Sequence, residues 1–216
     1  MSKIRFIDPL DPDPVLIRQA AYRLDQTGMV VLPTRHLYGL GVDALDPRAV
    51  ARVFAAKQRP RHQPLLILVA SIEEAGIYAQ GIGVRAKALM HAFWPGKLTI
   101  VLPAGPLLPE ALTGGTGRIG IRLVAHPVSR GLVRTLGRPI TATSANLSGH
   151  PGCRRIEDLQ PAILAAADLV LDAGPLLPGI GSTVVDVQPG VVRILREGAV
   201  KAGAIRTIVD GPVTGP

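Results

Sequence analysis

The sequence predicts a single α/β domain in which a twisted, mixed and mostly buried sheet is flanked by helices. Three observations predict this class. Strand-like apolar runs alternate with segments of helical period, no linker or internal repeat interrupts the alternation, and 47% of the 216 residues are hydrophobic. Alternation of this kind is typical of α/β folds, and a chain of this length can bury a substantial core.

The helices are predicted from apolar residues at helical spacing and from start signals. Asp followed by Pro occurs at residues 13–14 and 46–47. This pair is typical of a helix start, because Asp caps the first N–H groups and proline is tolerated at the first helical position. Ser71 with Glu74 three residues later forms a capping box. The helices expected cover residues 14–26, 47–58, a segment after Ser71, 84–93, 126–136 and 156–167.

The strands are predicted from compact apolar runs and, at residues 118–123, from alternation of apolar side chains. The strands expected cover residues 3–7, 29–33, 65–69, 98–102, 118–123, 140–143, 169–172, 182–186 and 192–195. The polar segment 33–41 is expected to be a loop that follows a strand. One domain is expected to span residues 1–216, with its core at about 13–200 and a short flexible tail after Gly198 that ends in GPVTGP.

Signals for export or membrane insertion are absent from the sequence. No apolar run approaches the roughly 18–20 residues that span a bilayer, and the first fourteen residues are acidic and proline-rich rather than a secretory signal. The single Cys153 cannot form an intramolecular disulfide. We therefore expect a cytoplasmic protein with no membrane partner.

The positive charge is concentrated in two stretches that contain no acidic residue. The chain has 24 Lys and Arg against 16 Asp and Glu, a formal net charge of +8. Half of these cations lie within residues 47–72 and 111–156. Two such blocks favour a polyanionic ligand, either nucleotide phosphates or RNA. Because only 3% of residues are aromatic, a binder of single strands that stacks bases is disfavoured.

Several common site motifs are absent from the sequence. It contains no GxxxxGK[ST] and no GxSxG, which excludes a P-loop and a serine nucleophile elbow. Gly39 and Gly41 match the dinucleotide-binding fingerprint only loosely, and the acidic residue expected about 20 positions later is missing. The five histidines show no i, i+3 or i, i+4 pair, so no metal site is expected.

Polar loops at strand and helix ends are the better candidates for a site, because α/β sheets bind ligands there. Segment 33–41 is one such loop. Lys57 and Arg59 leave a helix two positions apart, so both can reach one phosphate chain. The turn TSANLSG at 143–149 presents hydroxyl, amide and backbone N–H donors suited to an anion. An ordinary Asx or ST turn is the alternative for that turn alone.

Seven ordered segments resemble those of the YrdC-like family, the L-threonylcarbamoyl-AMP synthases that begin the t6A modification of tRNA. They are PTRHLYGLGVDA (33–44), KQRPRHQPLLILV (57–69), FWPGKLTIVLP (93–103), RIGIRLVAHPVSRGLV (118–133), ITATSANLSGHPG (140–152), GSTVVDV (181–187) and VVRILREGAV (191–200). The chain is similar to the short, single-domain form of the family. The resemblance implies a YrdC-like fold with a basic concave cavity.

The resemblance also implies an activity. The enzyme would be a nucleotidyltransferase that makes threonylcarbamoyl-AMP from L-threonine, bicarbonate and ATP and releases pyrophosphate, as the first step of t6A formation at tRNA position 37. ATP is then a substrate, and Mg²⁺ is carried by its phosphates. The implied partners are the downstream t6A transferase and tRNA, with double-stranded RNA as an open alternative.

The family's motifs place site residues on this chain. The K-x-R and S-x-N signatures fall on the catalytic candidates Lys57, Arg59, Ser144 and Asn146. The implied ATP-binding residues are Lys57, Arg59, Arg118, Ser144, Asn146, Gly152 and Arg196. The implied threonine-binding residues are Thr34, Arg122, Ala142 and Ser182. The motifs imply no metal ligand in the protein.

The chain departs from the family pattern beside these motifs. Two acids are lost, because Arg35 and Gly181 stand where the family usually has Glu, and Leu68 stands where His is frequent. Lys97 and Arg118 are two further cations that the usual pattern lacks. A more positive pocket is compatible with tighter anion binding or with a paralogue for another substrate.

Three functions therefore stay open from the sequence. The first is the synthase. The second is a non-synthesising paralogue that binds double-stranded RNA or tRNA on a basic concave face. The third is carbamoyl-adenylate chemistry like that of the related domain in hydrogenase-maturation proteins.

Overall fold

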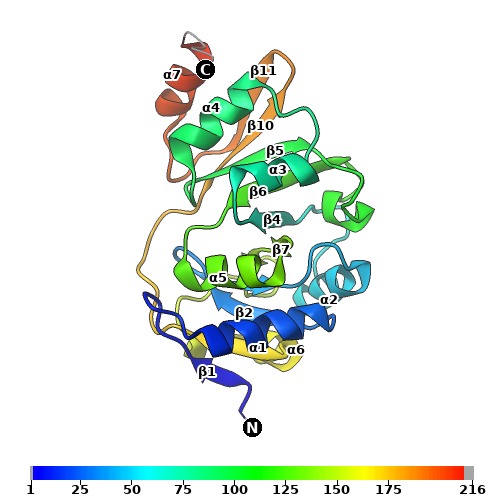
Figure 1. Ribbon diagram of the computed structural model, residues 1–216, viewed down its shortest axis with the longest axis vertical. Coiled ribbons are helices and arrows are strands. Elements are labelled where there is room, and N and C mark those ends of the chain that lie inside the picture. The colour runs from blue at the N-terminus through cyan, green and yellow to red at the C-terminus, as the bar shows by residue number, and fades with distance from the viewer. Residues whose placement is uncertain (1, 212–216) are drawn as a thin grey trace.

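The strands form two mixed sheets that lie one above the other along the long axis of the molecule (Figure 1). The computed structural model describes residues 2–211. Within them, the five-stranded sheet has the order β1 (Ile4–Phe6), β9 (Leu169–Asp172), β2 (Val30–Pro33), β3 (Tyr38–Gly41), β8 (Thr143–Ser144). The six-stranded sheet has the order β11 (Val191–Arg196), β10 (Thr183–Gln188), β5 (Leu98–Pro103), β6 (Arg118–Leu123), β4 (Leu66–Val69), β7 (Ile140–Thr141). The predicted mixed sheet is thus divided into two.

Helices pack around both sheets. They are α1 (Pro14–Asp25), α2 (Pro47–Lys57), α3 (Ile72–Tyr78), α4 (Val84–Phe93), α5 (Pro127–Leu136), α6 (Pro161–Ala166) and α7 (Ala202–Asp210), with 3₁₀ turns η1 (Glu110–Thr113) and η2 (Ile156–Asp158). Helices α1 and α5 pack against each other, as do α4 and α7. Figure 1 places α4 and α7 beside the six-stranded sheet, and α1, α2 and α6 around the other. Within the described residues, no helix combines the length and apolar character needed to cross a bilayer.

The predicted helix starts are confirmed by their caps. The Asp13 carboxylate accepts a hydrogen bond from the N–H of Val15 at 2.8 Å, and Asp46 accepts one from the N–H of Arg48 at 2.9 Å. At α3 the Ser71 hydroxyl accepts from the N–H of Glu74 at 3.2 Å. These bonds satisfy N–H groups that have no partner inside the helix.

Each face of β2 packs against a different apolar cluster. Val31 lies in the cluster that contains the α2 side chains Val50 and Val53. Val30 and Leu32 lie in the cluster that α1 and α5 cover. A strand buried on both faces reads as a continuous apolar run, which is why its sequence signal is strong.

The chain passes from one sheet to the other at residues 140–144. β7 pairs with β4 in the six-stranded sheet, and β8 pairs with β3 in the five-stranded sheet. The predicted strand 140–143 is therefore split at Ala142. The backbone N–H of Thr141 donates to the oxygen of Val42 at 2.9 Å, and the N–H of Val42 donates to the Thr141 hydroxyl at 3.1 Å. This passage places Ala142 and Ser144 at the junction of the sheets.

The prediction of a loop over the whole of 33–41 is wrong, because Tyr38–Gly41 forms strand β3, which lies between β2 and β8 in the five-stranded sheet. Tyr38 is fully buried, and its hydroxyl donates to the oxygen of Gly174 at 2.7 Å. The glycines that suggested a loop serve close packing instead. A Cβ at Gly41 would lie 2.7 Å from Cδ2 of Leu32.

Two further predictions near the C-terminus are corrected. The helix expected over 156–167 is the turn η2 followed by α6, which begins at Pro161. Proline has no N–H for an intrahelical bond, so a helix begins at it rather than running through it. The tail expected to be flexible after Gly198 contains α7, whose Ile205 is only 2% exposed. Residues 212–216 of the expected tail lie outside the described residues.

The burial of Ile205 predicts that α7 contributes to stability. Ile205→Ala should lower the free energy of unfolding by about 2–4 kcal/mol, because it removes buried methyl groups and leaves a cavity. Urea unfolding followed by circular dichroism measures this. The matched control is Ile77→Ala in α3, where the side chain is 54% exposed, and it should change stability by about 0.5 kcal/mol or less. Equal effects of the two substitutions would contradict the docking of α7.

Candidate active site

Two adjoining cavities lie where the sheets meet. The first, which we call the arginine cavity, has a volume of about 380 Å³ and is lined by residues of both sheets, including β3, β4, β6 and β8. The second, the lysine hollow, has a volume of about 510 Å³ and surrounds the end of α2 and the turn after β8. Arg59, Thr143 and Ser144 line both. A ligand can therefore extend from one cavity into the other.

The arginine cavity is strongly positive. Arg35, Arg59, Arg122 and Arg196 line it, and among its described lining residues none is Asp or Glu. Cations without neighbouring carboxylates create a potential that attracts anions, and the low-dielectric walls of a cavity strengthen it. The composition of this wall therefore suits a ligand with several negative charges.

Ser182, at the start of β10, fixes two of these arginines. Arg122 donates through Nη1 to the Ser182 hydroxyl at 3.0 Å, and Arg196 donates through Nη2 to the Ser182 backbone oxygen at 2.8 Å. The Ser182 hydroxyl also lies 2.9 Å from Oγ1 of Thr99. Burial lowers the pKa of Arg122 to about 10, and the like charges of Arg196 and Arg35 contribute. Arg122 is still a cation at neutral pH, so an anion bound there gains a fixed partner.

Lys57 holds the turn after β8 in place. It is the last residue of α2 and is 1% exposed, and its Nζ donates to the backbone oxygens of Ser144 and Asn146. In return, the N–H of Ser148 donates to the Lys57 backbone oxygen at 2.8 Å. Burial lowers the pKa of Lys57 to about 8, and the charge of Arg59 adds to this effect. Two of the three ammonium donors thus organise the turn, which leaves one for a ligand.

Arg59 reaches both cavities because the chain turns sharply at Gln58, whose φ of 50° is left-handed. Its Nη2 donates to the oxygen of Pro64 at 3.0 Å and its Nε to that of Gln63 at 3.3 Å. Burial lowers the pKa of Arg59. These two backbone bonds orient the guanidinium group without neutralising its charge.

Asn146 lines the lysine hollow with a free acceptor. Its Nδ2 donates to the oxygens of Leu147 at 2.7 Å and His150 at 2.6 Å. Its Oδ1 is buried and has no hydrogen-bond partner within the described part of the chain. A buried acceptor without a partner is unfavourable, so a bound ligand or its hydration shell would stabilise this side chain.

Thr34, Ala142 and His126 complete the wall of the arginine cavity. The Thr34 hydroxyl donates to the oxygen of Leu37 at 2.6 Å, which leaves its lone pairs as acceptors. His126 caps α5, where its Nδ1 accepts from the N–H of Val128 at 3.3 Å, and burial lowers its pKa to about 4. The ring is therefore neutral at pH 7, with its proton on Nε2. The sequence indicated only a helix start at His126, and no spacing signal marked it as a cavity residue.

Most residues expected at the site come together. Thr34, Arg122, Ala142, Ser182 and Arg196 line the arginine cavity. Lys57, Arg59, Ser144 and Asn146 line the lysine hollow. The departures Arg35, Leu68 and Gly181 also line the arginine cavity, whereas Lys97 is exposed and lines neither.

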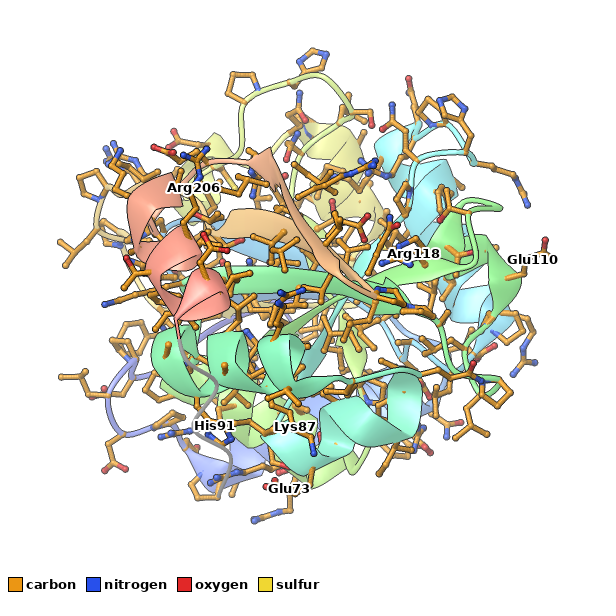
Figure 2. All side chains as sticks on the ribbon, turned by 90° about the horizontal axis from the view of Figure 1, so that it is seen from above. Glu73, Lys87, His91, Glu110, Arg118 and Arg206 are labelled. Carbon is orange, nitrogen blue, oxygen red and sulfur yellow. The ribbon has the colours of Figure 1, made fainter. Side chains whose placement is uncertain are left out.

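Two of the expected ATP-binding residues do not line a cavity. Arg118 forms an ion pair with Asp186 and donates to the oxygen of Val187 at 2.9 Å. It starts β6, four residues before Arg122 and so about 13 Å away along the strand, and Figure 2 shows it on the same side of the molecule as Glu110. The structure thus places Arg118 outside both cavities and paired with a carboxylate, and its expected role in ATP binding stays a prediction.

Gly152 does not line the arginine cavity but packs behind two residues that do. A Cβ at this position would be 2.9 Å from Cδ1 of Leu37 and 3.4 Å from Cβ of Ser144. Both neighbours line the arginine cavity. Gly152 thus lets Leu37 and Ser144 approach each other without itself facing the cavity.

Comparison with known proteins agrees with this geometry. Residues 23–198 match the Sua5/YciO/YrdC family, which carries the description "Telomere recombination". A curated relative from Pyrococcus abyssi, named threonylcarbamoyl-AMP synthase, is 36% identical over 193 residues, which are 89% of this chain and 57% of the relative. The crystal structure of P. abyssi Sua5 complexed with L-threonine superposes with a TM-score of 0.90 at 34% identity, over 96% of this chain and 61% of that one. E. coli YciO gives a TM-score of 0.85 at 27% identity, over 95% and 100%.

The fold and the site define an α/β protein with an arginine-lined cavity where two mixed sheets meet. The chain belongs to the Sua5/YciO/YrdC family. Both the resemblance and the predicted α/β class are thereby confirmed. The chain spans about three fifths of the length of the P. abyssi relative and of the P. abyssi structure.

The lowered pKa of Lys57 predicts a pH-dependent stability. The unfolded chain keeps this proton up to the ordinary pKa of 10.5, whereas the folded protein releases it at about 8. Unfolding between these values takes up a proton, so the free energy of unfolding rises with pH in this window. Lys57→Met should remove up to about 3 kcal/mol of this rise.

Urea unfolding at pH 7.5, 9 and 10.5 measures the effect as the difference between the wild type and each variant. Lys87→Met in α4, where the side chain is exposed, is the matched control (Figure 2). Its pH dependence should parallel that of the wild type. A parallel curve for Lys57→Met as well would contradict the lowered pKa.

Proposed function

We propose that this protein is an L-threonylcarbamoyl-AMP synthase, which joins L-threonine, bicarbonate and ATP and releases pyrophosphate and water. One observation carries the proposal: the arginine cavity and the lysine hollow share Arg59 and Ser144. A small anionic substrate and a triphosphate can therefore meet at one wall. Relatives with this activity in their name, and a family structure that contains L-threonine, support the same function.

L-Threonine would occupy the arginine cavity. Its carboxylate suits the planar fork of Arg122, which can donate two parallel hydrogen bonds. Thr34 and Ser182 would contact the polar remainder of the amino acid, and Ala142 would pack against it. The volume of about 380 Å³ suits a small amino acid together with the reacting end of a nucleotide.

The triphosphate would occupy the lysine hollow. Arg59 and the remaining donor of Lys57 would contact phosphate oxygens, together with the donors of the turn at Ser144 and Asn146. Arg196 would contact the nucleotide from the arginine cavity. Negative charge shifts to the departing pyrophosphate during the reaction, and preorganised cations stabilise that charge.

The chemistry has two steps that need no protein nucleophile. The threonine ammonium group and bicarbonate give an N-carboxylate, water and a proton. An oxygen of this N-carboxylate then attacks the α-phosphorus of ATP, a P–O bond forms, and the bond to pyrophosphate breaks. Two anions must approach each other, and at about 4 Å their repulsion is about 1 kcal/mol in water but several-fold larger in a cavity. The arginines around the cavity offset this repulsion.

Mg²⁺ would be held by the phosphates rather than by the protein. The described residues contain no group of three His, Cys, Asp or Glu that could hold an ion, and the described walls of both cavities carry no carboxylate. This donor set fits an ion coordinated by phosphate oxygens and water. When bound, the ion neutralises phosphate charge.

The product determines the next partner. Threonylcarbamoyl-AMP is a mixed anhydride that water hydrolyses, so a transferase that modifies tRNA must take it up promptly. This places the reaction where ATP and tRNA occur together, in the cytoplasm. Transfer of the threonylcarbamoyl group to tRNA then gives t6A at position 37.

The direct test is mass spectrometry of the products from purified protein with ATP, bicarbonate and L-threonine. Threonylcarbamoyl-AMP should form in amounts that depend on all three substrates. Pyrophosphate release that required neither threonine nor bicarbonate would refute the assignment. Product formed with carbamoyl phosphate in place of threonine and bicarbonate would instead indicate carbamoyl-adenylate chemistry.

The shared wall predicts which cations the turnover needs. Lys57→Ala and Arg59→Ala should each lower the rate of pyrophosphate release by about a hundredfold or more, because a preorganised charge is lost. Arg61→Ala is the matched control, since Arg61 is exposed in the same loop and lines neither cavity. It should keep most of the activity, and a comparable loss there would show that general loop damage is responsible.

The fork of Arg122 predicts an effect on threonine alone. Arg122→Lys keeps the charge but loses the two parallel donors, so the KM for L-threonine should rise by about tenfold or more while the KM for ATP changes little. Arg118→Lys, on the same strand, should leave both KM values nearly unchanged, because Arg118 lines neither cavity. A larger effect from Arg118→Lys would contradict this assignment of roles.

A further inference from the structure

Arg35 lines the arginine cavity and carries a buried hydrogen-bond donor that has no partner within the described residues. It follows Thr34 at the exit of β2 and lines the cavity. Its Nη1 is buried and has no hydrogen-bond partner within residues 2–211. A charged donor held away from water without an acceptor is costly, so a small rotation of the guanidinium group toward an acceptor on a bound ligand would be favourable.

Arg35 also increases the charge that Arg122 experiences. Burial is the main cause that lowers the pKa of Arg122, and the like charges of Arg196 and Arg35 add to it, which places both of these groups within electrostatic reach of Arg122. Of the described residues that line this cavity, none is a carboxylate that could offset them. With Arg196 assigned to the nucleotide, Arg35 and Arg122 remain for the substrate that occupies this cavity, and two cations suit a ligand with two negative groups.

A free amino acid fits this environment poorly. Its carboxylate is attracted to Arg122, but its ammonium group would face Arg35 and Arg196 without an acidic side chain to accept it. Like charges at close range in a cavity repel strongly. The same amino acid with a carboxylate on its nitrogen has two negative groups and no positive one.

We propose that Arg35 is a specificity residue that binds the carboxylate carried on the substrate's nitrogen, so that the cavity accepts threonine as its dianionic N-carboxylate and disfavours the zwitterion. This inference rests on the proposed function. The N-carboxylate forms when the ammonium group and bicarbonate combine with loss of water and a proton, so no other reactant is required. Arg122 then holds the α-carboxylate and Arg35 the new one.

A binding consequence separates this role from a structural one. Bicarbonate should tighten threonine binding to the wild-type protein by about tenfold or more, because a charge-assisted hydrogen bond is added. Arg35→Gln should reduce this ratio to near one without weakening the binding of threonine alone. Arg35→Lys, which keeps the charge, should retain most of the ratio.

Isothermal titration of L-threonine, with and without sodium bicarbonate and without ATP, measures the ratio. Arg206→Gln is the matched control, since Arg206 is exposed on α7 (Figure 2) and should keep the wild-type ratio. A ratio of one in the wild type, or an unchanged ratio in Arg35→Gln, overturns the inference. If the wild type still forms threonylcarbamoyl-AMP by mass spectrometry, the proposed function stands. If threonine binds under neither condition and no product forms, both are refuted.

Discussion

Repulsion among Arg35, Arg122 and Arg196 is the constraint on which the site depends. No carboxylate in the described wall of the cavity offsets these charges, and like charges repel more strongly in a cavity of low dielectric than in water. The strand framework holds them in place. Ser182 accepts from Arg122 and from Arg196, and β5 pairs with both β6 and β10. A bound anion would reduce this repulsion. Until one binds, the stability of the fold keeps the arginines in position.

The passage of the chain between the sheets positions the turn that lines the lysine hollow. Residues 140–144 leave the six-stranded sheet and enter the five-stranded one, and Lys57 fixes the following turn through two backbone oxygens. Lys57 therefore organises the turn as well as lining the lysine hollow. Arg59 lines both cavities and keeps its charge free of any carboxylate among the described residues that line them. The K-x-R motif thus combines the buried Lys57, which holds the turn, with Arg59, whose charge lines both cavities.

Local signals in the sequence predicted most elements, and long-range contacts account for the errors. The caps at Asp13 and Asp46 and the apolar run of β2 are visible within a few residues. Strand β3 was missed because Gly39 and Gly41 read as loop residues, whereas they allow close packing that depends on distant partners. The burial of helix α7 depends on its packing against α4, which the sequence of α7 alone does not indicate. The K-x-R and S-x-N motifs predicted that Lys57 and Ser144 lie at one site. No local pattern could predict the ion pair between Arg118 and Asp186, which are far apart in the sequence.

The three cations that the family pattern lacks differ in what they do. Lys97 is exposed, and Asp186 neutralises Arg118 outside both cavities. Only Arg35 brings its charge into the arginine cavity. Replacement of an acid by a cation at one position changes the local charge by two, and it adds to the charges of Arg59, Arg122 and Arg196 on the same cavity wall. A change of this kind alters which charged form of a substrate is bound more than which size of side chain is accepted. The departure at Arg35 is therefore compatible with the proposed synthase, and under the proposal it selects the charged form of the substrate rather than its size.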